Sequence, residues 1–154
     1  MRRFKTKVEA DGDRQQLLIT RDFDLPVGLL YRAYTEADLV AQWMENRVLK
    51  LDNHPHGGYI FEKTDPAGNV LFRANGTIHL VEQDKRIIRT FEMENSPFEV
   101  QLEFLDFEAL DNDRSRLRIQ MVFRSVADRD MLLSLPFQLG LDQAHERLEQ
   151  LHYT

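Results

Sequence analysis

Arg89 is the first side chain of this sequence whose type and position could do chemistry. In an alternating run it shares the parity of the apolar residues Phe91 and Met93. A guanidinium that faces an apolar interior must find an acceptor, either a protein carboxylate or the carboxylate or phosphate of a ligand. If the strand register differs by one residue, Arg89 is instead an ordinary surface arginine.

Histidines provide the other candidates. His145 follows Leu141 by four residues and precedes Leu148 by three, so it borders the apolar side of a helical pattern. There it could donate a proton to a ligand or in catalysis, or it could simply sit half exposed at the edge of a core. His54 and His56 could chelate a metal from a turn, but no third ligand is visible, and we predict no metal site.

Other chemistry is excluded or lacks its sequence signature. The chain has no cysteine, which excludes disulfides, thiolate metal sites, iron–sulfur clusters and a cysteine nucleophile. It has no GxSxG motif, Walker loop or dinucleotide fingerprint. We therefore predict no catalytic residues and no cofactor, and we favour a role without chemical turnover over an enzymatic one.

Length and composition indicate what kind of protein carries these side chains. The chain has 154 residues, of which 42% are hydrophobic, so we expect a single domain over residues 1–154. Its 20 basic and 26 acidic residues give a net charge of −6, which argues against a nucleic-acid partner. No apolar run has the length of a signal peptide or a membrane span, and we expect a cytoplasmic protein without membrane insertion.

The spacing of apolar residues predicts the helices and strands that position these side chains. A hairpin is predicted around the turn at residues 11–13, followed by two short helices, the first starting at Pro26 and the second carrying Trp43. Residues 47–123 alternate as an antiparallel meander, and helical spacing returns from Ala127, with a kink or break expected at Pro136. Gly76 inside a long strand predicts a bulge or a close backbone approach, and so a bent strand.

One strand of the meander has a particularly regular pattern. Phe98, Val100, Leu102 and Phe104 alternate with polar residues, which predicts that these four form the dry face of their strand.

The apolar face of such a sheet needs a cover, and only the C-terminal helix is long enough to provide it. We expect a ligand cavity between them, rich in adaptable Met and aromatic side chains. The candidate ligand-binding residues are Trp43, Phe61, Phe72, Arg89, Phe91, Met93, Phe104, Met121, Phe123, Met131, Leu135, Leu141 and His145. The alternative is that the apolar members only pack against one another, since their burial stabilises the protein with or without a ligand.

Three stretches resemble a known family: ITRDFDLPVGLLYRAYTEADLVAQWM, GGYIFEKTDPAGNVLFRANGTIHLVEQDKRIIRTFEME and GLDQAHERLEQL. They are similar to the START-like (SRPBCC, birch-pollen-allergen-like) superfamily, in the branch named after the activator of the ninety-kilodalton heat-shock-protein ATPase. The resemblance implies an α+β helix-grip fold, in which a curved antiparallel sheet wraps around a long C-terminal helix, with two short helices after the first strand. The chain differs in having Trp43-Met44 for a paired aromatic and Gly140-Leu141 for Gly-Trp.

Three functions agree with this resemblance. The first is binding of a hydrophobic or amphipathic small molecule in the cavity without turnover. The second is a chaperone-associated module that stimulates a heat-shock ATPase. The third is a cyclase- or hydrolase-like enzyme that uses Arg89 or His145 as a polar anchor. A homodimer is compatible with each of them.

Overall fold

The computed structural model describes residues 4–151 and residue 153. Its strands are β1 (Lys7–Glu9), β2 (Gln16–Phe23), β3 (Arg47–Leu51), β4 (Gly58–Thr64), β5 (Val70–Glu82), β6 (Arg86–Met93), β7 (Gln101–Ala109) and β8 (Ser115–Val122). Its helices are α1 (Val27–Thr35), α2 (Ala37–Met44), α3 (Val126–Leu133) and α4 (Phe137–Glu149).

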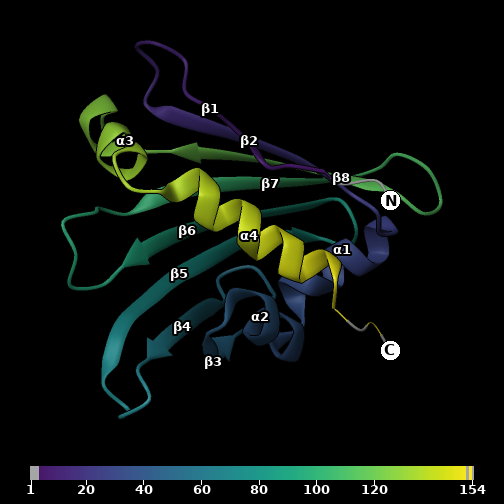
Figure 1. Cartoon of the computed structure of the whole chain (residues 1–154), viewed down its shortest axis with the longest axis horizontal. Helices are drawn as coiled ribbons and strands as arrows, with labels where there is room; N and C mark the ends of the chain where they lie inside the picture. The colour runs from purple at the N-terminus through teal and green to yellow at the C-terminus, as the bar shows by residue number, and fades with distance from the viewer. Residues whose placement is uncertain (1–3, 152, 154) are drawn as a thin grey trace.

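These strands form one antiparallel sheet in the order β1-β2-β8-β7-β6-β5-β4-β3. Figure 1 shows a curved sheet with α4 running across one of its faces, and with α1 and α2 beside the C-terminal end of α4. The predicted α+β helix-grip fold is therefore confirmed, including the N-terminal hairpin and the two short helices that follow β2.

The inner face of the sheet and the helices share a main hydrophobic core. Leu17 and Ile19 of β2 and Leu117 of β8 are fully or almost fully buried, and Leu148 of α4 packs in the same cluster. A second cluster lies on β4 and β5 and includes Val40 of α2. These clusters hold α4 and α2 against the sheet, because each buried apolar side chain contributes about 1.5–3 kcal/mol.

Strand β5 is curved (Figure 1) and has the close backbone approach predicted at Gly76. A Cβ atom on Gly76 would lie 2.1 Å from the carbonyl oxygen of Thr90 and 2.5 Å from the ring of Tyr59. No larger residue fits there without displacing the backbone of β6. The register between β5 and β6 shifts between Ile78 and Leu80, so the irregularity of the strand lies beyond Gly76.

The predicted orientation of β7 is wrong. Its buried positions are Gln101, Glu103, Leu105 and Phe107, whereas Leu102 and Phe104 lie on the opposite face. Apolar residues occur at both parities in this strand, so local alternation does not determine its register. Pairing with β6 does, because Glu103 stands directly opposite Arg89.

The C-terminal helical region breaks at Pro136, as expected. Helix α3 ends at Leu133 and α4 begins at Phe137, after a short non-helical elbow. Helix α4 continues through Gly140 without interruption. The elbow therefore turns the chain before α4 crosses the sheet.

Across residues 4–151 and 153, no helix combines the length and the apolar character needed to cross a membrane.

Candidate functional site

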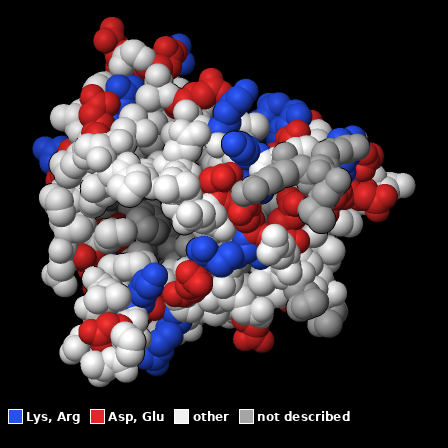
Figure 2. Space-filling view, viewed as in Figure 1, with Lys and Arg blue, Asp and Glu red and all other residues white. Residues whose placement is uncertain are grey.

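A pocket of about 510 Å³ lies between the inner face of the sheet, the end of α2 and the α3–α4 elbow. Figure 2 shows a hollow on this side of the molecule, bordered mainly by uncharged residues. The lining residues are Tyr34, Trp43, Met44, Asn46, Phe72, Arg89, Phe91, Met93, Phe98, Glu99, Gln101, Glu103, Ile119, Met121, Leu132, Leu135, Pro136, Phe137, Gly140, Leu141 and Ala144.

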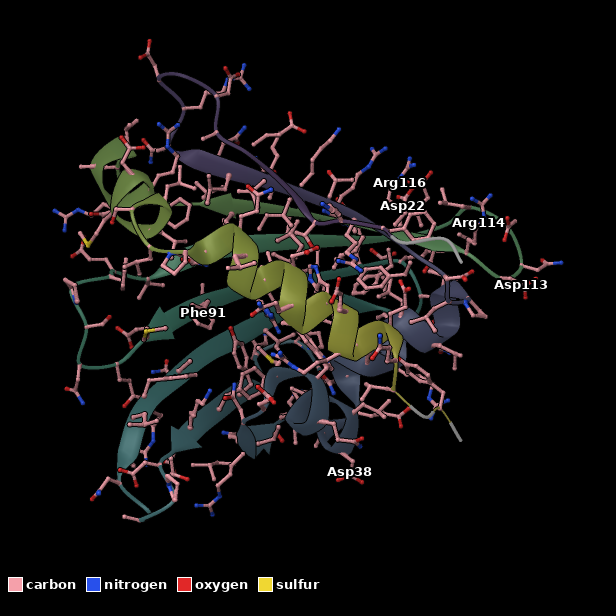
Figure 3. The ribbon with its side chains drawn as sticks, in the orientation of Figure 1. Asp22, Asp38, Phe91, Asp113, Arg114 and Arg116 are labelled. Carbon is pink, nitrogen blue, oxygen red and sulfur yellow. The ribbon has the colours of Figure 1, made fainter. Side chains whose placement is uncertain are left out.

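Eight of the thirteen predicted site residues line this pocket. They are Trp43, Phe72, Arg89, Phe91, Met93, Met121, Leu135 and Leu141. Figure 3 shows Phe91 extending from β6 near the N-terminal end of α4. The structure therefore brings these eight side chains together, and their role in binding a ligand stays a prediction.

The other five predicted residues are absent from the pocket lining. Phe61 packs with Tyr59 in the second core cluster, and Phe123 is buried in the main core. Phe104 lies on the outer face because β7 has the opposite orientation. On α3 the pocket is lined by Leu132 in place of its neighbour Met131. His145 is fully buried away from the pocket.

Arg89 faces inward, which rules out a surface position. It is 8% exposed, its Nε donates a hydrogen bond to Glu103 Oε1 at 3.0 Å, and its guanidinium carbon lies 5.0 Å from the centre of the Tyr59 ring. Burial lowers the pKa of Arg89, but Tyr59 and Glu103 outweigh this and raise it above its usual value. The guanidinium therefore stays charged beside an apolar pocket.

Arg89, Glu103 and Gln101 together form the polar wall of the pocket. Gln101 Nε2 donates to Glu103 Oε2 at 2.8 Å and lies 3.5 Å from the sulfur of Met121. Glu103 thus accepts one hydrogen bond on each carboxylate oxygen. Gln101 and Glu103 are not among the predicted site residues because the alternation pattern assigns them to the polar face of their strand. The signal that could have revealed them is the need of a buried Arg89 for a carboxylate.

Asn46 is a second polar group in the pocket lining. It follows α2, and its buried Oδ1 has no hydrogen-bond partner among the described residues. Buried amide oxygens are normally paired, and leaving one without a donor costs about 1–3 kcal/mol. Nothing in the sequence distinguishes Asn46 from any asparagine at a helix end.

Trp43 is fixed firmly at the wall of the pocket. Its Nε1 donates to the carbonyl of Ala33 at 2.7 Å, and its ring lies 5.0 Å from that of Tyr34. Arg147 of α4 donates to the carbonyl of Trp43 at 2.9 Å. Helices α1, α2 and α4 thus hold the indole in one orientation.

His145 belongs to a separate buried polar network behind the pocket. Its Nδ1 lies 2.7 Å from Thr6 Oγ1, and its Nε2 lies 3.5 Å from the hydroxyl of Tyr34. Asp142 accepts a hydrogen bond from Arg21 at 2.7 Å. Burial, followed by the charge of Arg21, lowers the pKa of His145 to about 3. The neutral imidazole ties α4 to the N-terminal segment.

A second hollow has a different character. It lies between Asp24 and the turn at residues 111–114 and is lined by polar and charged residues. Asp111 accepts hydrogen bonds from the backbone of Asp113 and from Arg114, both at 2.8 Å. Figure 3 shows this turn beyond the ends of β7 and β8. The carboxylate of Asp111 thus stabilises the turn itself.

No cluster of three or more His, Asp or Glu side chains suited to a metal ion occurs among residues 4–151 and 153.

A curved antiparallel sheet with a C-terminal helix packed across one face is the helix-grip fold. The chain belongs to the family described as Activator of Hsp90 ATPase homolog 1-like protein, whose sequence pattern matches residues 24–152. No curated protein matches the sequence.

Solved structures from several bacteria share the fold. Protein Ms6760 from Mycobacterium smegmatis has a TM-score of 0.82 and 19% identity, with 96% of this chain and 99% of that chain covered. A protein from Rhodobacter sphaeroides has a TM-score of 0.84 and 18% identity, with coverages of 94% and 95%. A protein from Arthrobacter aurescens has a TM-score of 0.81 and 17% identity, with coverages of 93% and 88%.

Proposed function

We propose that this protein binds a hydrophobic or amphipathic small molecule in the pocket between the sheet and α4, without chemical turnover. The observation that carries the proposal is the pocket itself, about 510 Å³ in volume and lined mainly by apolar side chains. Ligand pockets of proteins are typically of this size and composition, with a few polar groups that orient the ligand.

The alternative of a filled interior is less favoured. Phe91 and Met93 are only partly buried although they lie on the inner face of β6. A core built for packing alone would bury these large side chains against neighbours, because interiors are close-packed. A ligand that covers them would gain about 25 cal/mol for each Å² of apolar surface removed from water.

Trp43, the only tryptophan of the chain, offers a direct test. We expect ω-bromodecanol to quench its fluorescence in a saturable manner, because Trp43 lines the pocket and bromine quenches only at close range. Bromoethanol carries the same bromine and hydroxyl groups on a chain of only two carbons. It should quench far less at equal concentration, since Trp43 is 3% exposed.

Two variants of α4 sharpen this test. Gly140→Phe adds a ring at a lining position where a Cβ meets no atom within 4 Å, so it should weaken the quenching by occupying the pocket. Gln143→Phe adds the same ring at an exposed position outside the lining and should leave the quenching unchanged. Equal quenching in both variants, or none in the unmodified protein, would exclude the pocket as a binding site.

Stimulation of a heat-shock ATPase is a second candidate, favoured by the family description and by the outer face of the sheet. There Ile88, Phe104, Gln120 and Leu18 stand opposite one another across β6, β7, β8 and β2. Leu18 is 41% exposed. If this row contacts the ATPase, the protein should raise its turnover and Leu18→Glu should reduce the effect; unchanged turnover would eliminate this candidate.

A further inference from the structure

The polar wall of the pocket has hydrogen-bond donors to spare. Glu103 accepts one hydrogen bond on each carboxylate oxygen, from Arg89 Nε at 3.0 Å and from Gln101 Nε2 at 2.8 Å. The terminal nitrogens of Arg89 make no hydrogen bond with the described part of the chain, yet neither is among its buried polar atoms without a partner. Solvent therefore reaches them, and because Arg89 lines the pocket on the inner face of the sheet, it reaches them through the pocket.

The pocket is polar at its buried end and mainly apolar at its mouth. All three residues of the polar wall are buried. At the α3–α4 elbow, by contrast, the lining residue Leu135 is 48% exposed and Pro136 is exposed beside it. Glu99, an exposed charged residue of the lining, is already paired with Arg124 at 2.7 Å. An amphiphile in this pocket thus meets free donors deep inside and apolar side chains at the entrance, where Figure 2 shows the hollow.

We infer that the ligand binds head first, an inference that rests on the proposed function. Its head is a hydrogen-bond acceptor, such as a carbonyl oxygen, which meets the terminal nitrogens of Arg89, and its hydrocarbon tail runs to the mouth beside Leu135. The reverse orientation would press hydrocarbon against the guanidinium and leave charged donors buried without an acceptor, which is costly. Head-first binding pairs these donors and also covers apolar surface that is exposed at the mouth.

A spin label at the tail end of a ligand reports this orientation. Methyl 16-doxylstearate has an ester carbonyl at one end and a nitroxide near the other, and a nitroxide broadens the NMR signals of nearby methyl groups. Met121 is the reporter at the polar wall, because its sulfur lies 3.5 Å from Gln101 Nε2. Leu135→Met adds a reporter at the mouth, and such a swap is usually tolerated. We expect the introduced methyl signal to lose more intensity than that of Met121 at every ligand concentration.

Arg89→Met combined with Glu103→Leu removes the anchor and replaces the buried ion pair by apolar side chains of similar volume. In this double variant both reporters should lose intensity equally. Methyl decanoate should lose about tenfold in affinity relative to 1-bromodecane, which has no oxygen, when both are followed through the methyl signal of Met121. The matched control is Arg116→Met with Asp22→Leu, an ion pair of 2.6 Å on the outer face (Figure 3), which should change neither result.

The outcomes separate this inference from the proposed function. A larger loss of intensity at Met121 than at position 135, or an equal loss at both, overturns head-first binding but leaves the binding pocket standing. This result decides the inference even if the double variant does not fold. An orientation that persists in the folded double variant overturns Arg89 as the anchor and with it the inference. If neither these ligands nor ω-bromodecanol bind, the proposed function fails as well.

Discussion

Replacing Arg89 by methionine is expected to lower the free energy of unfolding by about 3–5 kcal/mol, because it leaves the carboxylate of Glu103 buried without its cation. Chemical denaturation at neutral pH measures this loss. The double replacement Arg89→Met with Glu103→Leu should recover most of it, since apolar side chains of similar volume replace a buried ion pair at little cost.

An exposed ion pair serves as the control. Arg124 and Glu99 pair at 2.7 Å, but their side chains are 71% and 48% exposed. Arg124→Met should therefore change the stability by less than about 1 kcal/mol. If Arg89→Met were as mild as Arg124→Met, the buried pair at the pocket wall would not exist in solution.

Acidification is expected to destabilise the protein through His145. Its pKa is 6.5 in an unfolded chain and about 3 in the folded protein, where burial and Arg21 oppose the charge. Between these values the unfolded chain binds a proton that the folded protein does not bind. The stability contributed by neutral His145 is complete above pH 6.5 and falls by about 1.4 kcal/mol per pH unit below it.

Urea denaturation of the unmodified protein and of His145→Gln between about pH 4.5 and pH 6.5 checks this dependence. Glutamine retains a donor and an acceptor for Thr6 and Tyr34 but does not titrate. The variant should show the smaller slope of stability with pH, whatever its stability at neutral pH. Equal slopes would mean that His145 titrates normally and is not buried.

Much of the fold follows from local signals in the sequence. Strand β8 alternates without ambiguity, and its apolar residues Leu117, Ile119 and Met121 all face inward. Gly76 marks the close approach of two strands because it has no Cβ atom, and Pro136 marks the helix break because it has no backbone N–H. Such signals act within a few residues, so one sequence is enough to detect them.

The site is less predictable because long-range contacts decide it. In β7 both parities carry apolar residues, and the pairing of Glu103 with Arg89 across the sheet decides which face is inner. His145 has helical spacing typical of a core border, but Thr6, 139 positions away in sequence, completes its burial. Asn46 lies in the pocket lining because residues of β6, β7 and α4, distant in sequence, meet the end of α2 there.

The methionines provide the most direct test of ligand binding in the pocket. Met44, Met93 and Met121 line it, whereas Met131 on α3 lies outside the lining. In a titration of methyl-labelled methionine with ω-bromodecanol, followed by NMR, the signals of the three lining residues should shift together and saturate, and that of Met131 should stay in place. Unchanged signals of all three, or a shift of Met131 alone, would contradict the proposal that a small molecule occupies this space.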